Sequence, residues 1–228
     1  LPSLVYAEDP LWHPEETKSV AFSFSPHNPY FMKNKVWVGV EDGQSRLAGF
    51  FDPDLRIDDK SVAYFGYWDS MDSVAPNQKL FKDFEKWAAD QGAQRIYGPI
   101  NFSTFGSYRI RLNTFEEGAF PSEPYNAPYY AGLLEELGYT CGQKYMSQMM
   151  KMEAAVEKVG GKRGAFNIAP EAQGFSVDLM DGAKFLEALP EMYAMVDDIF
   201  GQNLGYTPIP YELFEMACGQ PYSKRMCP

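Results

Sequence analysis

The chain has 228 residues, of which 45% are hydrophobic and 22% are charged, a balance typical of globular proteins. It lacks any run of the roughly 18–20 apolar residues that a membrane-spanning helix needs. The formal net charge of −11, from 20 basic and 31 acidic residues, argues against nucleic acid as the main partner, because neutralising phosphates requires clustered Lys and Arg. We therefore expect neither a nucleic-acid nor a membrane partner. The acidic surface either serves solubility alone or favours a cationic or amine-bearing partner.

The cysteines and histidines indicate neither a disulfide framework nor a metal site. His13 and His27 lack the spacing of metal ligands, so no metal is expected. The first residues, from Leu1, lack both an initiator Met and the basic start of a signal peptide, which predicts that the sequence begins inside a longer chain. Three cysteines, odd in number and far apart, are typical of a reducing compartment, and we expect a cytoplasmic protein: Cys141, Cys218 and Cys227.

The first third of the chain predicts an antiparallel meander. Lys35–Val40 is rich in β-branched and aromatic residues, and Asp42-Gly43 is a turn signal. Ser45–Phe51 should return as its antiparallel partner. Val62–Trp68 is almost wholly apolar, which predicts a central strand covered on both faces.

The pattern then changes from strand to helix. Apolar residues in Asn77–Gln91 fall on one helical face, and Gly92 ends the helix. Arg95–Tyr97 should be a strand parallel to the third one, which gives a right-handed crossover. After Thr104 comes a long irregular segment, which is a candidate wall of a pocket.

The remainder predicts another helix, a last strand and a second unit. A helix should run from Pro128 to Leu137, followed by a strand over Lys144–Met152. Phe175–Leu179 is expected to be a strand that precedes two helices. We predict three divisions of the chain: a first module over 1–153, a linker over 154–174, and the opening strand and helices of a second, truncated module over 175–228.

The order of these elements and several short segments resemble the GNAT acyltransferase superfamily, and more specifically GNAT-like proteins built from two such modules in tandem. The resemblance covers about the first 152 residues. The segments that carry it are Asp9–Pro14 (DPLWHP), Asn28–Phe31 (NPYF), Gly98–Thr104 (GPINFST), Pro124–Tyr130 (PYNAPYY) and Gly138-Tyr139 (GY), and Asn203–Pro208 (NLGYTP) looks like the opening of the second module.

The resemblance implies an α/β (α+β) fold with a mixed, mostly antiparallel central sheet flanked by helices, here without its first strand. Its sheet would splay open to admit acetyl-CoA or another acyl-CoA. The implied reaction is acyl transfer from a thioester to an amine, carried by a small amine-bearing substrate or a peptide. A further alternative is that the chain is a structural half that only supports the second module, and a homodimer formed through the helices of 175–228 would fit that alternative.

Two groups of residues are the implied ligands of acyl-CoA. Backbone donors near Tyr67 and Trp68 would steady the thioester oxygen. Side chains before and at the start of the following helix would bind the rest of the acyl-CoA, and these are Ser70, Ser73 and Asn77. Side chains after the fourth strand would do the same or could equally cap local turns, and these are Asn101, Ser103 and Thr104.

The sequence departs from catalytic GNAT modules in two places. Their pyrophosphate loop reads Q/R-x-x-G-x-G/A, whereas the loop from Asp69 to Gln78 contains two acids, a proline and no glycine. Leu134 stands where many of these enzymes place the Tyr that protonates the leaving thiolate. Tyr129 and Tyr130, one turn earlier, are the catalytic candidates, and the alternative is that they pack the helix onto the sheet. We therefore expect a degenerate first module; the alternative function is a non-catalytic binding or scaffolding module.

Overall fold

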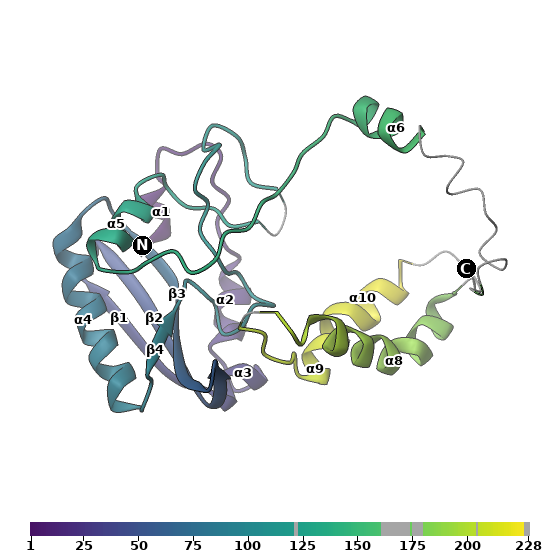
Figure 1. Cartoon of the computed structure of the whole chain (residues 1–228), viewed down its shortest axis with the longest axis horizontal. Coiled ribbons are helices and arrows are strands. Elements are labelled where there is room, and N and C mark those ends of the chain that lie inside the picture. Colours follow the sequence, from purple (N-terminus) through teal and green to yellow (C-terminus); the bar gives the residue numbers. More distant parts are fainter. Residues whose placement is uncertain (121–122, 161–173, 175–179, 204, 226–228) are drawn as a thin grey trace.

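Four strands form one mixed sheet in the order β1-β2-β3-β4. The first three are antiparallel neighbours and the fourth runs parallel to the third, which confirms the predicted mixed, mostly antiparallel sheet flanked by helices (Figure 1). The structure is a computed structural model that describes residues 1–120, 123–160, 174, 180–203 and 205–225. The strands are β1 (Lys35–Glu41), β2 (Ser45–Ile57), β3 (Lys60–Ser70) and β4 (Arg95–Tyr97).

Two helices cover one face of the sheet. α4 (Val74–Asp90) links β3 to β4 and turns its apolar face, with Phe84 fully buried, onto the strands. α5 (Tyr130–Glu136) extends the same layer. Because side chains alternate along a strand, this layer receives alternate residues of β2 and β3: Leu47, Phe51, Ala63 and Phe65.

The opposite face carries a second hydrophobic cluster. It combines the other alternate residues of β2 and β3 with Tyr30 of α3 (Pro29–Lys33) and Phe24 at the end of α2 (Thr17–Ser23). β3 therefore buries both of its faces, as its apolar sequence predicted. The strand residues of this cluster include Ala48, Phe50, Val62 and Tyr64.

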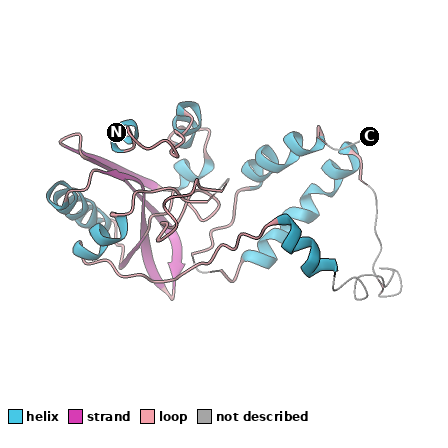
Figure 2. Ribbon diagram, turned by 90° about the horizontal axis from the view of Figure 1, so that it is seen from above, coloured by secondary structure: helices cyan, strands magenta, loops and turns pink. Residues whose placement is uncertain are grey.

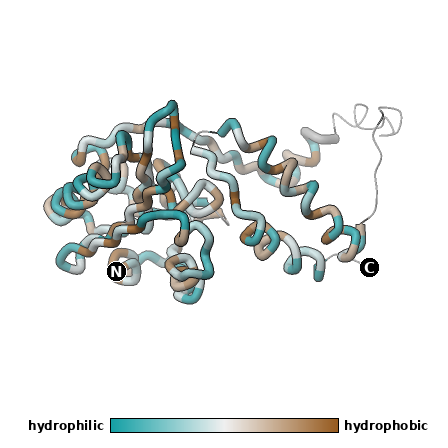
Figure 3. The backbone as a smooth tube through the Cα atoms, turned by 90° about the horizontal axis from the view of Figure 1, so that it is seen from below, coloured by the Kyte–Doolittle hydropathy of each residue, from teal (hydrophilic) through white to brown (hydrophobic). Residues whose placement is uncertain are grey.

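The C-terminal helices form an arm beside the sheet (Figures 1 and 2). Hydrophobic and hydrophilic stretches alternate along these helices, as expected for amphipathic segments (Figure 3). The Tyr64 hydroxyl donates a hydrogen bond of 3.1 Å to the carbonyl of Gly205, and the Tyr30 hydroxyl donates one of 3.2 Å to Pro208. Apolar residues of the arm join the second cluster, so the arm shares a core with the sheet: Phe185, Leu189, Ile209 and Phe214.

The remaining helices are short, apart from the long helix of the arm. That helix, α8 (Gly182–Phe200), is capped by the Asp181 side chain and runs through Pro190 without a break. No helix in the described ranges is long and apolar enough to cross a membrane. The others are α1 (Pro2–Val5), α6 (Met152–Gly160), α9 (Tyr211–Phe214), the π-helical turn η2 (Glu215–Gly219) and α10 (Gln220–Ser223).

The predicted strand over Lys144–Met152 is wrong. Residues 139–151 have no regular secondary structure, and Met152 begins α6, so residues 154–160 of the predicted linker are helical. The segment is anchored by side chains instead of by strand pairing: Tyr145 packs edge-on against Tyr108, and the Ser147 hydroxyl donates to Glu123. The strand predicted over 175–179 lies outside the described residues.

The core at α4 generates a stability prediction. Phe84→Ala should lower the free energy of unfolding by about 3–5 kcal/mol, because it removes a fully buried ring and leaves a cavity between α4 and the sheet. Urea denaturation measures this change. The matched control is Phe120→Ala, where the ring is 68% exposed and the expected change is below about 0.5 kcal/mol; equal losses in the two variants would contradict the assigned core.

Candidate functional site

A cleft opens where β3 and the chain after β4 separate. The two strands pair from Val62 and Arg95 to Tyr64 and Tyr97, and a last hydrogen bond of 2.7 Å joins the Ile100 N–H to the Phe65 carbonyl. Beyond this point lies a cavity of about 220 Å³. It sits at the carboxyl ends of two parallel strands, where ligands commonly bind in open α/β sheets.

Glycine is required where the two segments still touch. A Cβ on Gly66 would lie 2.5 Å from both the Asn101 side-chain oxygen and the Ile100 carbonyl. A Cβ on Gly98 would lie 2.5 Å from the Phe65 ring. These contacts explain why the chain after β4 starts with glycine and can pass so close to β3.

A β-bulge in β3 shapes the floor of the cleft. Arg46 pairs with Asp69 and Ala48 pairs with Gly66, so two residues of β3 stand opposite Leu47 alone. The first of the two, Tyr67, has a φ of 46°, and its N–H donates a 2.7 Å hydrogen bond to Asn101 Oδ1. The bulge turns the end of β3 away from the chain after β4.

The predicted ligand Asn101 therefore lines the cleft in a fixed orientation. A backbone N–H can face only the oxygen of the amide, which places Asn101 Oδ1 on Tyr67 and leaves Nδ2 on the other side. Among the described residues Nδ2 has no hydrogen-bond partner, and it is not among the buried unsatisfied atoms. Ser103 instead caps a local turn, accepting from the Phe105 N–H at 3.2 Å, and neither it nor Thr104 lines the cleft.

The predicted ligands before and in α4 hydrogen-bond to one another inside the protein. Asn77 is fully buried: its Oδ1 accepts from Ser45 and from the Trp68 indole at 2.8 and 3.0 Å. Its Nδ2 donates to Ser70 Oγ and to the Ser73 carbonyl at 2.5 and 2.7 Å. The network fixes the turn between β3 and α4, and a ligand could use these atoms only by displacing it.

Tyr129 and Tyr130 both lie at the end of β3. The Tyr129 hydroxyl donates to the Ser70 carbonyl at 2.6 Å, and the Tyr130 hydroxyl accepts from the Ser70 N–H at 2.9 Å. Only Tyr130 lines the cleft, where the Tyr6 hydroxyl lies 3.2 Å from its oxygen. Burial raises the pKa of Tyr129 to about 12 and raises that of Tyr130 further above its ordinary value. Leu134 packs into the apolar layer beneath α4.

An ion cluster that was not predicted forms one side of the cleft. Arg46 Nε and Nη2 each lie 2.6 Å from Asp69 Oδ2, and Nη2 lies 3.5 Å from Glu15. Burial raises the pKa of both carboxyls, while the Arg46 charge opposes that rise. Arg46 and Asp69 are directly opposite across β2 and β3 only because the bulge shifts the register by one residue. A regular alignment of the two predicted strands would place Arg46 opposite Trp68, so the sequence pattern did not reveal this pair.

Aromatic side chains form much of the remaining wall. Tyr6 stacks on Trp12 at 5.3 Å and meets Tyr125 edge-on at 5.8 Å, and the Tyr125 hydroxyl bonds to Asp9. The irregular segment after Thr104 contributes residues 107–110 and 123–126 to the lining. The prediction that this segment is a pocket wall is confirmed.

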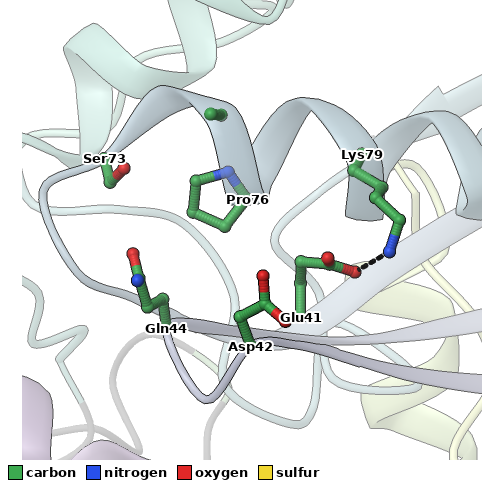
Figure 4. A pocket seen from close by; sticks show the side chains of 7 residues that line it. Glu41, Asp42, Gln44, Ser73, Pro76 and Lys79 are labelled. Atoms are coloured by element: carbon green, nitrogen blue, oxygen red, sulfur yellow. Dashed lines mark hydrogen bonds and ion pairs between the residues drawn. The ribbon is translucent and has the colours of Figure 1, made fainter.

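A second hollow of about 360 Å³ borders the first turn of α4 (Figure 4). Glu41 and Asp42 line it, and the Lys79 amine is paired with Glu41. Ser73, the N-cap residue, makes no side-chain hydrogen bond to the helix. Two carboxylates against one lysine make this end of α4 unfavourable for a phosphate, in keeping with the loop that lacks glycine.

Comparisons with known proteins place one curated relative beside this chain. Protein YghO of Escherichia coli (strain K12) is 27% identical to it over 156 residues, which is 66% of the chain and 40% of YghO. The chain therefore spans less than half the length of that relative. No protein-family model matches the chain, and no solved structure matches it. The name YghO states no activity. Any inference about a ligand of this chain therefore rests on the residues of the cleft.

The Asn77 network generates a prediction. Asn77→Ala should lower the free energy of unfolding by roughly 2–4 kcal/mol, because it strands the buried hydroxyl, indole and carbonyl groups that the amide joins. Chemical denaturation measures the loss. Asn113→Ala is the matched control, since that residue is exposed; a loss no larger than the control's would show that the network does not hold the turn.

The raised tyrosine pKa values give a pH prediction. An unfolded tyrosine ionises at a pH of about 10, whereas burial raises the pKa of Tyr129 and Tyr64 to about 12. Their contribution to stability is complete below pH 10 and is lost as the pH rises through 12. Absorbance at 295 nm should show late-ionising tyrosines in the folded protein, and one fewer in Tyr129→Phe. A folded titration identical to that in urea would contradict this.

Proposed function

We propose that this chain is a GNAT-like module that binds an amine-bearing ligand in the cleft and acylates that amine with an acyl-CoA. The observation that carries the proposal is the separation of β3 from the chain after β4 at a bulge, with an open cavity at that point. The order of elements supports it: three antiparallel strands, a crossover helix and a parallel strand.

The charges and rings of the cleft suit an amine. Glu15 and Asp69 face Arg46, which leaves one negative charge in excess on this side. Aromatic faces attract cations and pack against the carbon skeleton that carries them. The raised pKa of Glu15 makes it the better base for removing a proton from an ammonium group.

Three side chains contribute to the reaction. The ammonium first loses one proton to solvent, and the neutral amine nitrogen then attacks the thioester carbonyl carbon, so that a C–N bond forms and the C–S bond breaks. Asn101 Nδ2 donates to the carbonyl oxygen, because the Tyr67 N–H that would otherwise do so is bonded to Asn101 Oδ1. Glu15 takes the proton from the nitrogen and passes it to the departing thiolate. Tyr130, whose raised pKa disfavours full proton transfer, stabilises that thiolate by hydrogen bonding.

A second candidate function is ligand binding without catalysis. It is favoured by two observations: the Tyr67 N–H is already bonded to Asn101, and acids line the hollow at the start of α4. Both lower the affinity expected for acyl-CoA. The cleft and its amine-binding side are common to the two functions.

Measurements of acetyl-CoA binding and of thiol release separate the catalytic function from the binding function. Calorimetry should detect binding of acetyl-CoA, and thiol release from acetyl-CoA should depend on an added amine. Glu15→Gln should slow that release by about a hundredfold or more. Glu116→Gln, an exposed acid outside the cleft, is the matched control.

The outcomes have distinct meanings. Amine binding without acetyl-CoA binding would replace the catalytic function by the binding one. Absence of both would remove the proposal. Equal rates in Glu15→Gln and the control would remove Glu15 as the base while leaving the reaction in place.

A further inference from the structure

We propose that Arg109 is a binding subsite for an anionic group of the ligand, and that the ligand is an amino-carboxylate and not a simple amine. The role of this ligand as the acyl acceptor rests on the proposed function, whereas the anion subsite does not. The argument begins with the backbone. Arg109 lies in the cleft wall with a φ of 77°, and its N–H donates to the Pro99 carbonyl at 3.0 Å. A non-glycine residue in this region is strained, and such positions cluster at ligand sites.

Two aromatic rings hold the guanidinium in place. Its central carbon lies 4.4 Å from the centre of the Tyr108 ring and 4.9 Å from that of Tyr145. The two rings are perpendicular, with their centres 5.9 Å apart. A stacked guanidinium loses little further freedom when it binds an anion, which favours tight recognition.

The guanidinium is nevertheless short of hydrogen-bond partners. Its polar contact in the described part of the chain is Glu123, 3.4 Å from Nη2, and Glu123 also accepts from the Ser147 hydroxyl at 3.1 Å. Arg109 Nε is buried and has no hydrogen-bond partner among the described residues. A guanidinium has five N–H donors, so most of its donor capacity is available to an incoming anion.

Arg111, two residues along the same segment, shows the contrast. Its Nε donates to the Asn113 carbonyl at 3.0 Å, its Nη1 donates to the Glu117 carbonyl at 2.9 Å, and its Nη2 donates to Thr114. Arg111 therefore holds the loop together through its own donors. Arg109, with the same side chain, uses one guanidinium donor on Glu123, donates from that side chain to no carbonyl of the described residues, and lines the cleft.

The rest of the cleft fixes the class of ligand. Arg109 is paired with Glu123 at 3.4 Å and keeps further N–H donors for a carboxylate. Glu15 with Asp69 exceeds Arg46 by one negative charge. The lining can therefore hold a carboxylate and an ammonium of one molecule. Aromatic walls favour an apolar side chain between them. The cavity of about 220 Å³ is smaller than the ~300–1,000 Å³ of pockets for drug-sized ligands, which suits a single amino acid.

The test compares L-phenylalanine with 2-phenylethylamine, which has the same skeleton without the carboxylate, by calorimetry in the absence of CoA. The wild type should bind phenylalanine on the order of ten- to a hundredfold more tightly, as expected for a charge-assisted bidentate pair. Arg109→Met should abolish that preference, and Arg109→Lys should retain only part of it. Arg111→Met should lower the melting temperature and keep the preference.

Several results would overturn the subsite: no preference in the wild type, binding of neither probe, or a preference that survives in Arg109→Met. If Arg109 instead bound an anionic group of the acyl donor, Arg109→Met would weaken acetyl-CoA binding and leave phenylalanine binding unchanged. That result would also overturn the proposal that the ligand is an amino-carboxylate. Selective phenylalanine binding without acyl transfer would keep the subsite and remove the proposed reaction. Acyl transfer to phenylalanine and to 2-phenylethylamine with equal efficiency would keep the proposed reaction and remove the subsite.

Discussion

One hydrogen bond determines how the cleft is built: the Tyr67 N–H donates to Asn101 Oδ1 across the point where β3 and the following chain separate. The bulge would otherwise leave this donor without a strand partner, and an unpaired buried N–H is costly. By accepting it, Asn101 ties the chain after β4 to the bulge and directs its own Nδ2 away from β3. Gly66 permits the contact, because any larger residue would occupy the space of the amide.

Much of the fold could be predicted because local patterns and packing agree in the first half of the chain. The apolar run from Val62 to Trp68 is buried on both faces, and the helical face of Asn77–Gln91 packs on the sheet. The strand predicted over Lys144–Met152 is wrong, because residues 144–151 are irregular and Met152 begins α6. Composition indicates how well a residue fits a strand, but a strand also needs the edge of a neighbouring strand to pair with. The edge strand β4 is only three residues long, so it offers little backbone for pairing.

The site was predictable only where a motif or a long loop marked it. Asn101 and the wall after Thr104 followed from sequence; Ser70, Ser73 and Asn77 were expected at a cofactor but hydrogen-bond one another. The charged side chains of the cleft come from segments far apart in the chain, and no spacing joins Glu15 to Arg46. Arg109 and Arg111 are the same residue type two positions apart, so the sequence does not distinguish their roles. Their difference lies in which carbonyl groups the folded loop brings within reach.

Amide hydrogen exchange of Tyr67, followed by NMR in the wild type and in Asn101→Ala, tests the central claim most directly. If Asn101 holds the bulge, the Tyr67 amide is protected in the wild type, and the substitution accelerates its exchange while amides in the paired part of β3, such as Tyr64, keep their protection. Rapid exchange of Tyr67 in the wild type, or protection that survives in Asn101→Ala, would contradict the proposed construction of the cleft.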